Sequence, residues 1–128
     1  MLKRITTIAA LLFGLLGNTA SAQIESRQQK IKAERARSTY SMVIGSLDRI
    51  VKASKPAGTD LEVIRDARRN LTDLEGATNF RPVDGPGIDI AVSKLQKVQE
   101  LAVLSDQDRS QLQGQIRALR QLRLNIQP

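Results

Sequence analysis

The sequence predicts an all-α protein, a small bundle of about four helices arranged as two helical hairpins. Apolar residues recur at intervals of three and four, the spacing that places side chains on one face of an α-helix. Segments rich in Gly and Pro interrupt this pattern at 56–58 and 76–87. Glycine gives access to positive φ and proline removes a backbone donor, so helices end at such segments. The helices are expected roughly over 24–55, 60–76, 87–103 and 106–126.

The first 22 residues have the pattern of a secretory signal peptide. A short basic start, Met1–Arg4, precedes an apolar run of 12 residues from Ile5 to Leu16, and Ala20-Ser-Ala22 provides the small residues of a cleavage site. The run is shorter than the roughly 20 residues that span a bilayer as a helix. We therefore expect cleavage after Ala22, export to a bacterial periplasm or beyond it, and one mature domain over residues 23–128.

The composition argues against most enzymatic chemistry. With no Cys and no His, the chain lacks disulfides, the commonest general base and the usual transition-metal ligands. Asp106-x-Asp108-x-Ser110 begins like a calcium loop, but Gln111 and Arg117 stand where the loop requires Gly and Glu. No Ser-x-x-Lys pair and no phosphate-binding glycine motif is present. We expect a protein that is not an enzyme and that binds no metal and no cofactor.

The charge balance is basic. The formal net charge is +7, and it falls to +5 when Lys3 and Arg4 are removed with the signal peptide. A basic exported protein is attracted to acidic protein surfaces, anionic lipid or cell-wall polymers. Nucleic acid is not an expected partner, because Tyr40 and Phe80 are the only aromatic residues of the mature chain on which bases could stack.

The first expected helix, 24–55, has a long apolar face and a basic beginning. Its apolar face consists of Ala33, Ala36, Tyr40, Val43, Ile44, Leu47, Ile50 and Val51. Residues 24–32 are polar on nearly all sides, so this end is expected to fray or to project from the bundle. Arg27 and Lys30 belong to a basic run there, which is either a solvated helix end or, if the segment is unstructured, an arm that binds anions.

The second expected helix, 60–76, begins at Thr59-Asp-Leu-Glu62, which matches the capping-box pattern. Its apolar face consists of Leu61, Ile64, Ala67, Leu71 and Leu74. The Gly/Pro loop 76–87 follows and carries Phe80 and Arg81. Phe80 either plugs the end of the bundle beneath the loop, which is the commoner role, or projects as an anchor for a partner, because aromatic and arginine side chains dominate interface hot spots.

The third and fourth expected helices, 87–103 and 106–126, are joined by a very short link, because Ser105-Asp-Gln-Asp108 has the pattern of a second capping box. A short link makes the two helices antiparallel neighbours. Their apolar faces consist of Ile88, Ala91, Val92, Leu95, Val98 and Ala102, and of Leu112, Ile116, Leu119, Leu122 and Ile126.

Four arginines, which we call the arginine stripe, lie beside the apolar face of the fourth helix. They are Arg109, Arg117, Arg120 and Arg123. Guanidinium groups aligned in this way either recognise carboxylate or phosphate groups, or cover the edge of the core with their aliphatic stems.

Two short segments, Leu71-Thr-Asp-Leu-Glu75 and Leu104-Ser-Asp-Gln-Asp108, resemble the paired LTxxQ motifs of small periplasmic helical stress proteins. Both segments end in an acid where that family has Gln, and the second has Ser in place of Thr. The resemblance implies a cradle-shaped dimer and, as in the ATP-independent chaperone of the family, weak binding of unfolded proteins.

These observations lead us to expect an exported protein that acts by protein–protein interaction, as an accessory or adaptor subunit of an envelope system or as an immunity protein. Its partner would be another envelope or exported protein, or a second copy of the chain. A holdase-like periplasmic chaperone dimer and a cationic binder of anionic lipid or cell-wall surfaces are the alternatives. The candidate interaction residues are Arg109, Arg117, Arg120, Arg123, Phe80, Arg81, Arg27 and Lys30.

Overall fold

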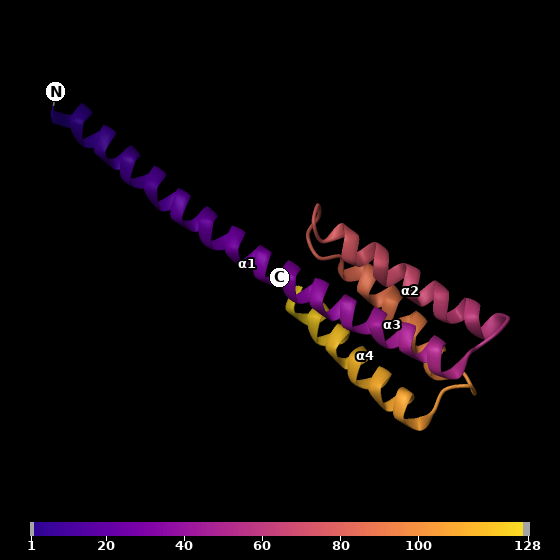
Figure 1. The fold of residues 1–128 in the computed structure, drawn as a ribbon. Coiled ribbons are helices and arrows are strands. Elements are labelled where there is room, and N and C mark those ends of the chain that lie inside the picture. The colour runs from indigo at the N-terminus through magenta and orange to yellow at the C-terminus, as the bar shows by residue number, and fades with distance from the viewer. Residues whose placement is uncertain (1, 127–128) are drawn as a thin grey trace. The chain divides into compact units, whose positions relative to one another are not determined.

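The computed structural model describes the backbone of residues 2–126 and the side chains of residues 26–126. Four α-helices and no strand occur in this part of the chain, which confirms the predicted small all-α bundle (Figure 1). The helices are α1 (Leu2–Ser54), α2 (Thr59–Ala77), α3 (Gly85–Gln99) and α4 (Asp106–Ile126). No helix among the described residues is both long enough and apolar enough to cross a membrane.

The chain forms two compact units, Met1–Lys32 and Ala33–Pro128, and the second unit contains the helical bundle. The predicted signal peptide falls in the first unit. Its side chains lie outside the described residues, so cleavage after Ala22 stays a prediction.

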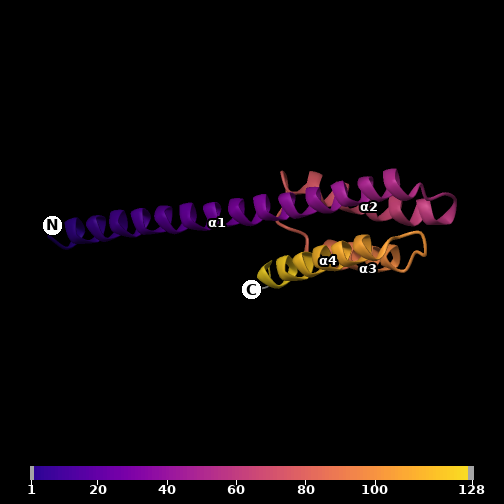
Figure 2. The same ribbon diagram turned by 60° about the horizontal axis from the view of Figure 1, so that its bottom comes forward.

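The bundle is an antiparallel ring in which each helix contacts the next (Figures 1 and 2). Short connections reverse the chain between consecutive helices, which makes consecutive helices antiparallel neighbours. Contact between α4 and the carboxy-terminal half of α1 closes the ring. Polar side-chain contacts join the helices around the ring, among them Asp48–Arg68, Asp66–Lys94, Asp89–Arg123 and Ser46–Gln115.

A single hydrophobic core fills the ring, and all four helices contribute to it. The periodicity of the sequence predicts most of its members. The buried apolar residues are Ala36, Tyr40, Val43, Leu47, Ile50, Ile64, Ala67, Leu71, Leu74, Ile88, Ala91, Leu95, Val98, Leu104, Leu112, Ile116, Leu119 and Leu122. Because these side chains pack against one another, the apolar faces of the helices are covered within one copy of the chain.

The capping box expected at Thr59 is not formed. Thr59 is the first residue of α2, and Gly58 occupies the capping position with a φ of 60° and no side-chain hydrogen bond. The amide of Glu62 donates to the carbonyl oxygen of Gly58, 3.2 Å away. A positive φ suits glycine, so the chain enters the helix one residue earlier than the threonine pattern indicates.

The Gly/Pro loop is shorter than the expected 76–87. Helix α2 continues through Gly76 to Ala77, and α3 already begins at Gly85. Asp84 caps α3 by accepting a 3.0 Å hydrogen bond from the amide of Gly87. Pro86 lies in the first turn, where its missing N–H removes no helical hydrogen bond. With Asp84 as its cap, α3 begins at Gly85, two residues before the expected start.

Helix α3 ends at Gln99 and not at 103, so residues 100–105 form a longer connection than predicted. Leu104 is buried from this connection, whereas Ala102 is exposed and does not belong to an apolar helix face. One half of the second predicted capping box is confirmed, because the amide of Asp108 donates to the hydroxyl of Ser105, 3.1 Å away. The chain thus leaves the helix early to place Leu104 in the core.

Candidate interaction surface

Phe80 lies on the connection between α2 and α3 with 87% of its surface exposed. The expectation that it plugs the end of the bundle is therefore wrong. Arg81 follows it and is exposed as well. A large aromatic side chain in water loses the free energy that burial would provide, about 1.5–3 kcal/mol for a residue of this size. Phe80 and Arg81 together form an exposed pair of the residue types that anchor protein interfaces.

Backbone hydrogen bonds hold this pair in a compact turn. The amides of Phe80 and Arg81 both donate to the carbonyl oxygen of Ala77, at 3.0 and 2.9 Å. The hydroxyl of Thr78 donates to the carbonyl oxygen of Glu75 at 2.6 Å. The turn therefore continues the hydrogen-bonding pattern of α2, and Phe80 lies on this hydrogen-bonded turn.

Arg37 ties the same turn to α1. Its Nε donates to the Thr78 hydroxyl at 3.2 Å, and its Nη2 donates to Oδ1 of Asn79 at 2.6 Å. No local pattern marks Arg37, because its partners lie about forty residues further along the chain.

Beneath the loop, Tyr40 carries a buried hydroxyl for which no hydrogen-bond partner is present among the described residues. Burial raises the pKa of Tyr40 to about 12, and the negative charge of nearby Asp84 adds to this shift. Both effects disfavour a tyrosinate anion. Tyr40 therefore stays neutral at any physiological pH, and it serves the core as an aromatic side chain.

The arginine stripe is divided by the structure into internal and exposed residues. Arg109 donates from Nε to the carbonyl oxygen of Gln99 at 3.0 Å and from Nη2 to that of Leu101 at 2.8 Å. It also lies 3.3 Å from a carboxylate oxygen of Asp106. Arg109 thus satisfies carbonyl groups left open at the end of α3, and this role removes it from the candidate surface.

Arg123 is also used within the bundle. Its Nε lies 3.2 Å from a carboxylate oxygen of Asp89, so it connects α4 to α3. Its guanidinium group covers Gly85, where an added Cβ would lie 2.5 Å from Nη1 of Arg123. Arg117 and Arg120, in contrast, are exposed, and neither forms an ion pair or a side-chain hydrogen bond with a described residue. These two arginines remain as the candidate charged surface of α4.

Arg27 and Lys30 belong to the first compact unit and are exposed on α1. The backbone there is helical, which favours the solvated helix end over an unstructured arm.

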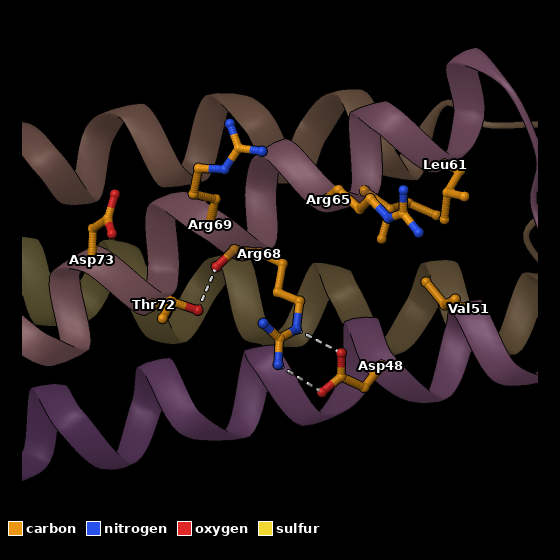
Figure 3. A pocket seen from close by; sticks show the side chains of 9 residues that line it. Asp48, Val51, Leu61, Arg65, Arg68, Arg69, Thr72 and Asp73 are labelled. Carbon is orange, nitrogen blue, oxygen red and sulfur yellow. Dashed lines mark hydrogen bonds and ion pairs between the residues drawn. The ribbon is translucent and has the colours of Figure 1, made fainter.

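An open groove of about 460 Å³ lies between α1 and α2 (Figure 3). Three arginines of α2 line it, Arg65, Arg68 and Arg69, and no local sequence pattern marks them as a site. Arg68 pairs with Asp48 through hydrogen bonds of 2.7 and 3.3 Å, and these contacts raise its pKa. Arg69 points away from Asp48 in Figure 3, so the three guanidinium groups do not converge on one point. The groove therefore lacks the geometry of an anion-binding pocket.

The described residues offer no group of three or more Asp, Glu, His or Cys side chains that could hold a metal ion. Within residues 26–126 the surface instead presents one exposed aromatic residue, Phe80 on its hydrogen-bonded turn, and two exposed arginines on α4.

The chain matches no protein-family model, no curated protein and no solved structure.

Proposed function

We propose that this chain is an exported, non-enzymatic protein that acts by binding another envelope or exported protein. The observation that carries this proposal is the exposed Phe80, with Arg81 beside it, on a turn that hydrogen bonds hold in place. A preformed turn loses little conformational entropy when it binds, so an aromatic anchor presented on it favours association. Such a contact would suit an accessory or adaptor subunit or an immunity protein, because each of these acts by binding another protein.

The proposed export depends on the first 22 residues, whose basic start, apolar run and Ala20-Ser-Ala22 fit a signal peptide. Expression in a bacterial host, followed by fractionation and amino-terminal sequencing, tests this part. We expect a mature protein in the periplasmic fraction that begins at Gln23. A full-length chain that begins at Met1 and stays in the cytoplasm would contradict it.

The binding part is tested by photo-crosslinking in living cells of the native host. A photoreactive phenylalanine analogue replaces Phe80 in one variant and Ala102 in a matched control. Ala102 is also exposed in a connection between helices, but this connection follows α3 and carries no exposed aromatic residue. We expect one heterologous protein to be crosslinked from position 80 and not from position 102.

Other outcomes would replace the proposal. Crosslinks from position 80 to many unrelated exported proteins would indicate the holdase-like chaperone instead. The structure gives that alternative little support, because the apolar helix faces that a cradle requires are packed in the core. Absence of any protein crosslink at position 80 would contradict binding through this turn.

A further inference from the structure

The exposed part of the arginine stripe indicates the chemistry of the partner. Arg117, Arg120 and Leu124 follow one another at intervals of three and four residues, so they lie on one face of α4 and span about two helical turns. Both arginines are exposed, and 61% of the surface of Leu124 is exposed. We call these three residues the α4 face.

The α4 face has an uncompensated positive charge. Residues 110–126 contain no Asp and no Glu. Asp89, which approaches this part of α4 from α3, is already paired with Arg123 at 3.2 Å. Arg117 and Arg120 therefore have no acidic partner among the described residues, although the other two arginines of the stripe are both bonded within the bundle.

We propose that the α4 face binds an acidic amphipathic helix of another protein; this inference rests on the proposed function and names the chemistry of its partner. Arg117 and Arg120 lie about one turn apart, which matches two carboxylates one turn apart on a partner helix. Arginine binds carboxylate through two parallel hydrogen bonds, which gives both affinity and orientation. Leu124 supplies an apolar contact beside the charges, as amphipathic helices require.

The charge of the α4 face favours an acidic helix over a second copy of the chain, a lipid surface or a nucleic acid. The mature chain carries a formal charge of +5, so two copies repel each other. Lipid-binding basic clusters contain about four to eight Lys or Arg residues, whereas the α4 face has two. A nucleic acid would find no aromatic residue on this face on which to stack a base.

The first test uses a synthetic amphipathic helix of about 20 residues with Leu on one face and Glu on the flanks, and a matched peptide in which Lys replaces each Glu. NMR of the isotope-labelled mature protein maps the contact. We expect the Glu peptide to shift amide signals within residues 117–124 and the Lys peptide to shift none. Binding should weaken as salt rises, because the charges are exposed.

Charge reversal then assigns the contact to particular arginines. Arg117→Glu with Arg120→Glu should weaken binding of the Glu peptide at least ~tenfold. The matched control is Arg65→Glu with Arg69→Glu, which reverses two exposed arginines one turn apart on α2. The affinity of the control variant for the Glu peptide should stay within about twofold of that of the unmodified protein. Equal losses in both double variants, or amide shifts centred on α2, would overturn the proposal. Circular dichroism confirms that each variant is folded.

An in-cell experiment separates this inference from the proposed function. A photoreactive residue at Gln121, which is exposed on α4 beside the α4 face, is compared with the one at position 80. We expect a crosslink from position 121 to a segment rich in Asp and Glu, and its loss in the Arg117→Glu, Arg120→Glu variant. A crosslink from position 80 alone would overturn this inference and leave the proposed function standing, whereas no crosslink from either position would contradict both. A crosslink from position 121 to a second copy, or to a neutral or basic segment, would overturn the inference as well. It would also be overturned if the protein bound phosphatidylglycerol vesicles and the Arg117→Glu, Arg120→Glu variant did not.

Discussion

The guanidinium group of Arg37 on α1 donates a hydrogen bond to the hydroxyl of Thr78, 3.2 Å away, although 41 positions separate the two residues in the chain. A second bond from Arg37 reaches Asn79. Phe80 follows directly, so the position of the exposed aromatic ring depends on a contact between α1 and the end of α2. The presentation of Phe80 is therefore a property of the folded bundle and not of the loop sequence alone.

Replacement of Arg37 should loosen this turn. We expect Arg37→Ala to lower the free energy of unfolding by about 1 kcal/mol, since it removes two hydrogen bonds from a partly exposed charged donor. Hydrogen exchange at the amides of residues 78–81 should accelerate, and crosslinking from position 80 should decrease. Arg35→Ala is the matched control, because the Arg35 side chain is exposed on the same helix and has no side-chain partner among the described residues. Equal exchange rates in the two variants would show that Arg37 does not hold the turn.

The division of the arginine stripe predicts two kinds of variant. Arg109→Ala should lower the free energy of unfolding by about 1–2 kcal/mol, because the carbonyl groups of Gln99 and Leu101 lose a charged donor. Arg117→Ala and Arg120→Ala should change it by less than about 0.5 kcal/mol, as is usual for exposed residues without partners. Chemical denaturation measures the free energy of unfolding of all three variants in the mature protein. A loss at Arg117 as large as that at Arg109 would show that its stem packs against the bundle.

The apolar faces could be predicted from the sequence because helical periodicity is local. Ala36, Tyr40 and Leu47 are buried as their spacing indicates, and the cap at Ser105 forms as its pattern indicates. The uses of Arg123 and Arg37 could not be predicted in this way. Each depends on the rotation of a helix against a neighbour distant in sequence, since Arg123 pairs with Asp89 and Arg37 with Thr78.

The exposure of Phe80 and the early end of α3 also depend on tertiary contacts. An isolated loop sequence shows an aromatic residue but not the direction in which a turn presents it. Apolar residues follow Gln99 in the sequence and could extend α3. The helix nevertheless ends at Gln99, and Leu104 enters the core from the connection. Burial of Leu104 and the hydrogen bonds from Arg109 to the carbonyl oxygens of Gln99 and Leu101 stabilise this early end.

A side chain in place of Gly87, in the first turn of α3, should lower the stability of the protein. A Cβ at this position would lie 2.5 Å from Cδ2 of Leu74 and 2.6 Å from Oδ2 of Asp84, so it would disturb both the core and the cap. We expect Gly87→Ala to lower the free energy of unfolding by about 1–3 kcal/mol. Gly114→Ala is the control, because nothing lies within 4 Å of a Cβ added in the middle of α4. The control should raise stability by about 1 kcal/mol, since alanine favours helix. Thermal unfolding that ranks the two variants the other way would contradict the predicted packing.

Replacement of Lys55 by glycine should stabilise the protein. It follows the last residue of α1 with a φ of 46°, in the left-handed region, and its amide donates to the carbonyl oxygen of Val51 at 3.0 Å. Glycine adopts this conformation without steric conflict, so Lys55→Gly should raise the free energy of unfolding by up to about 1 kcal/mol. Lys52→Gly, within the last turn of α1, should instead lower it by about 1 kcal/mol. If both glycines destabilise the protein in urea titrations, the end of α1 has a different conformation.

Tyr40 should make the stability of the protein depend on pH in the alkaline range. Its pKa rises from the usual 10.0 to about 12 in the folded protein. Between these values the folded state holds a proton that the unfolded state has released, so stability falls as pH rises from about 10 to about 12. The full loss amounts to about 2–3 kcal/mol for a shift of this size. The contribution is complete below the unfolded pKa and is absent above the folded one.

Comparison with Tyr40→Phe isolates this effect from the titration of lysines. The variant loses only a hydroxyl that is buried without a partner, so at neutral pH we expect its stability to equal that of the unmodified protein or to exceed it by up to about 1 kcal/mol. Its advantage should grow as pH passes from about 10 towards 12. Tyr40 is the only tyrosine and the chain has no tryptophan, so the ultraviolet absorbance of tyrosinate reports this one group. A titration midpoint near 10 in the folded protein, or parallel stability curves for the two proteins, would mean that the hydroxyl reaches water and that the core opens beside Asp84.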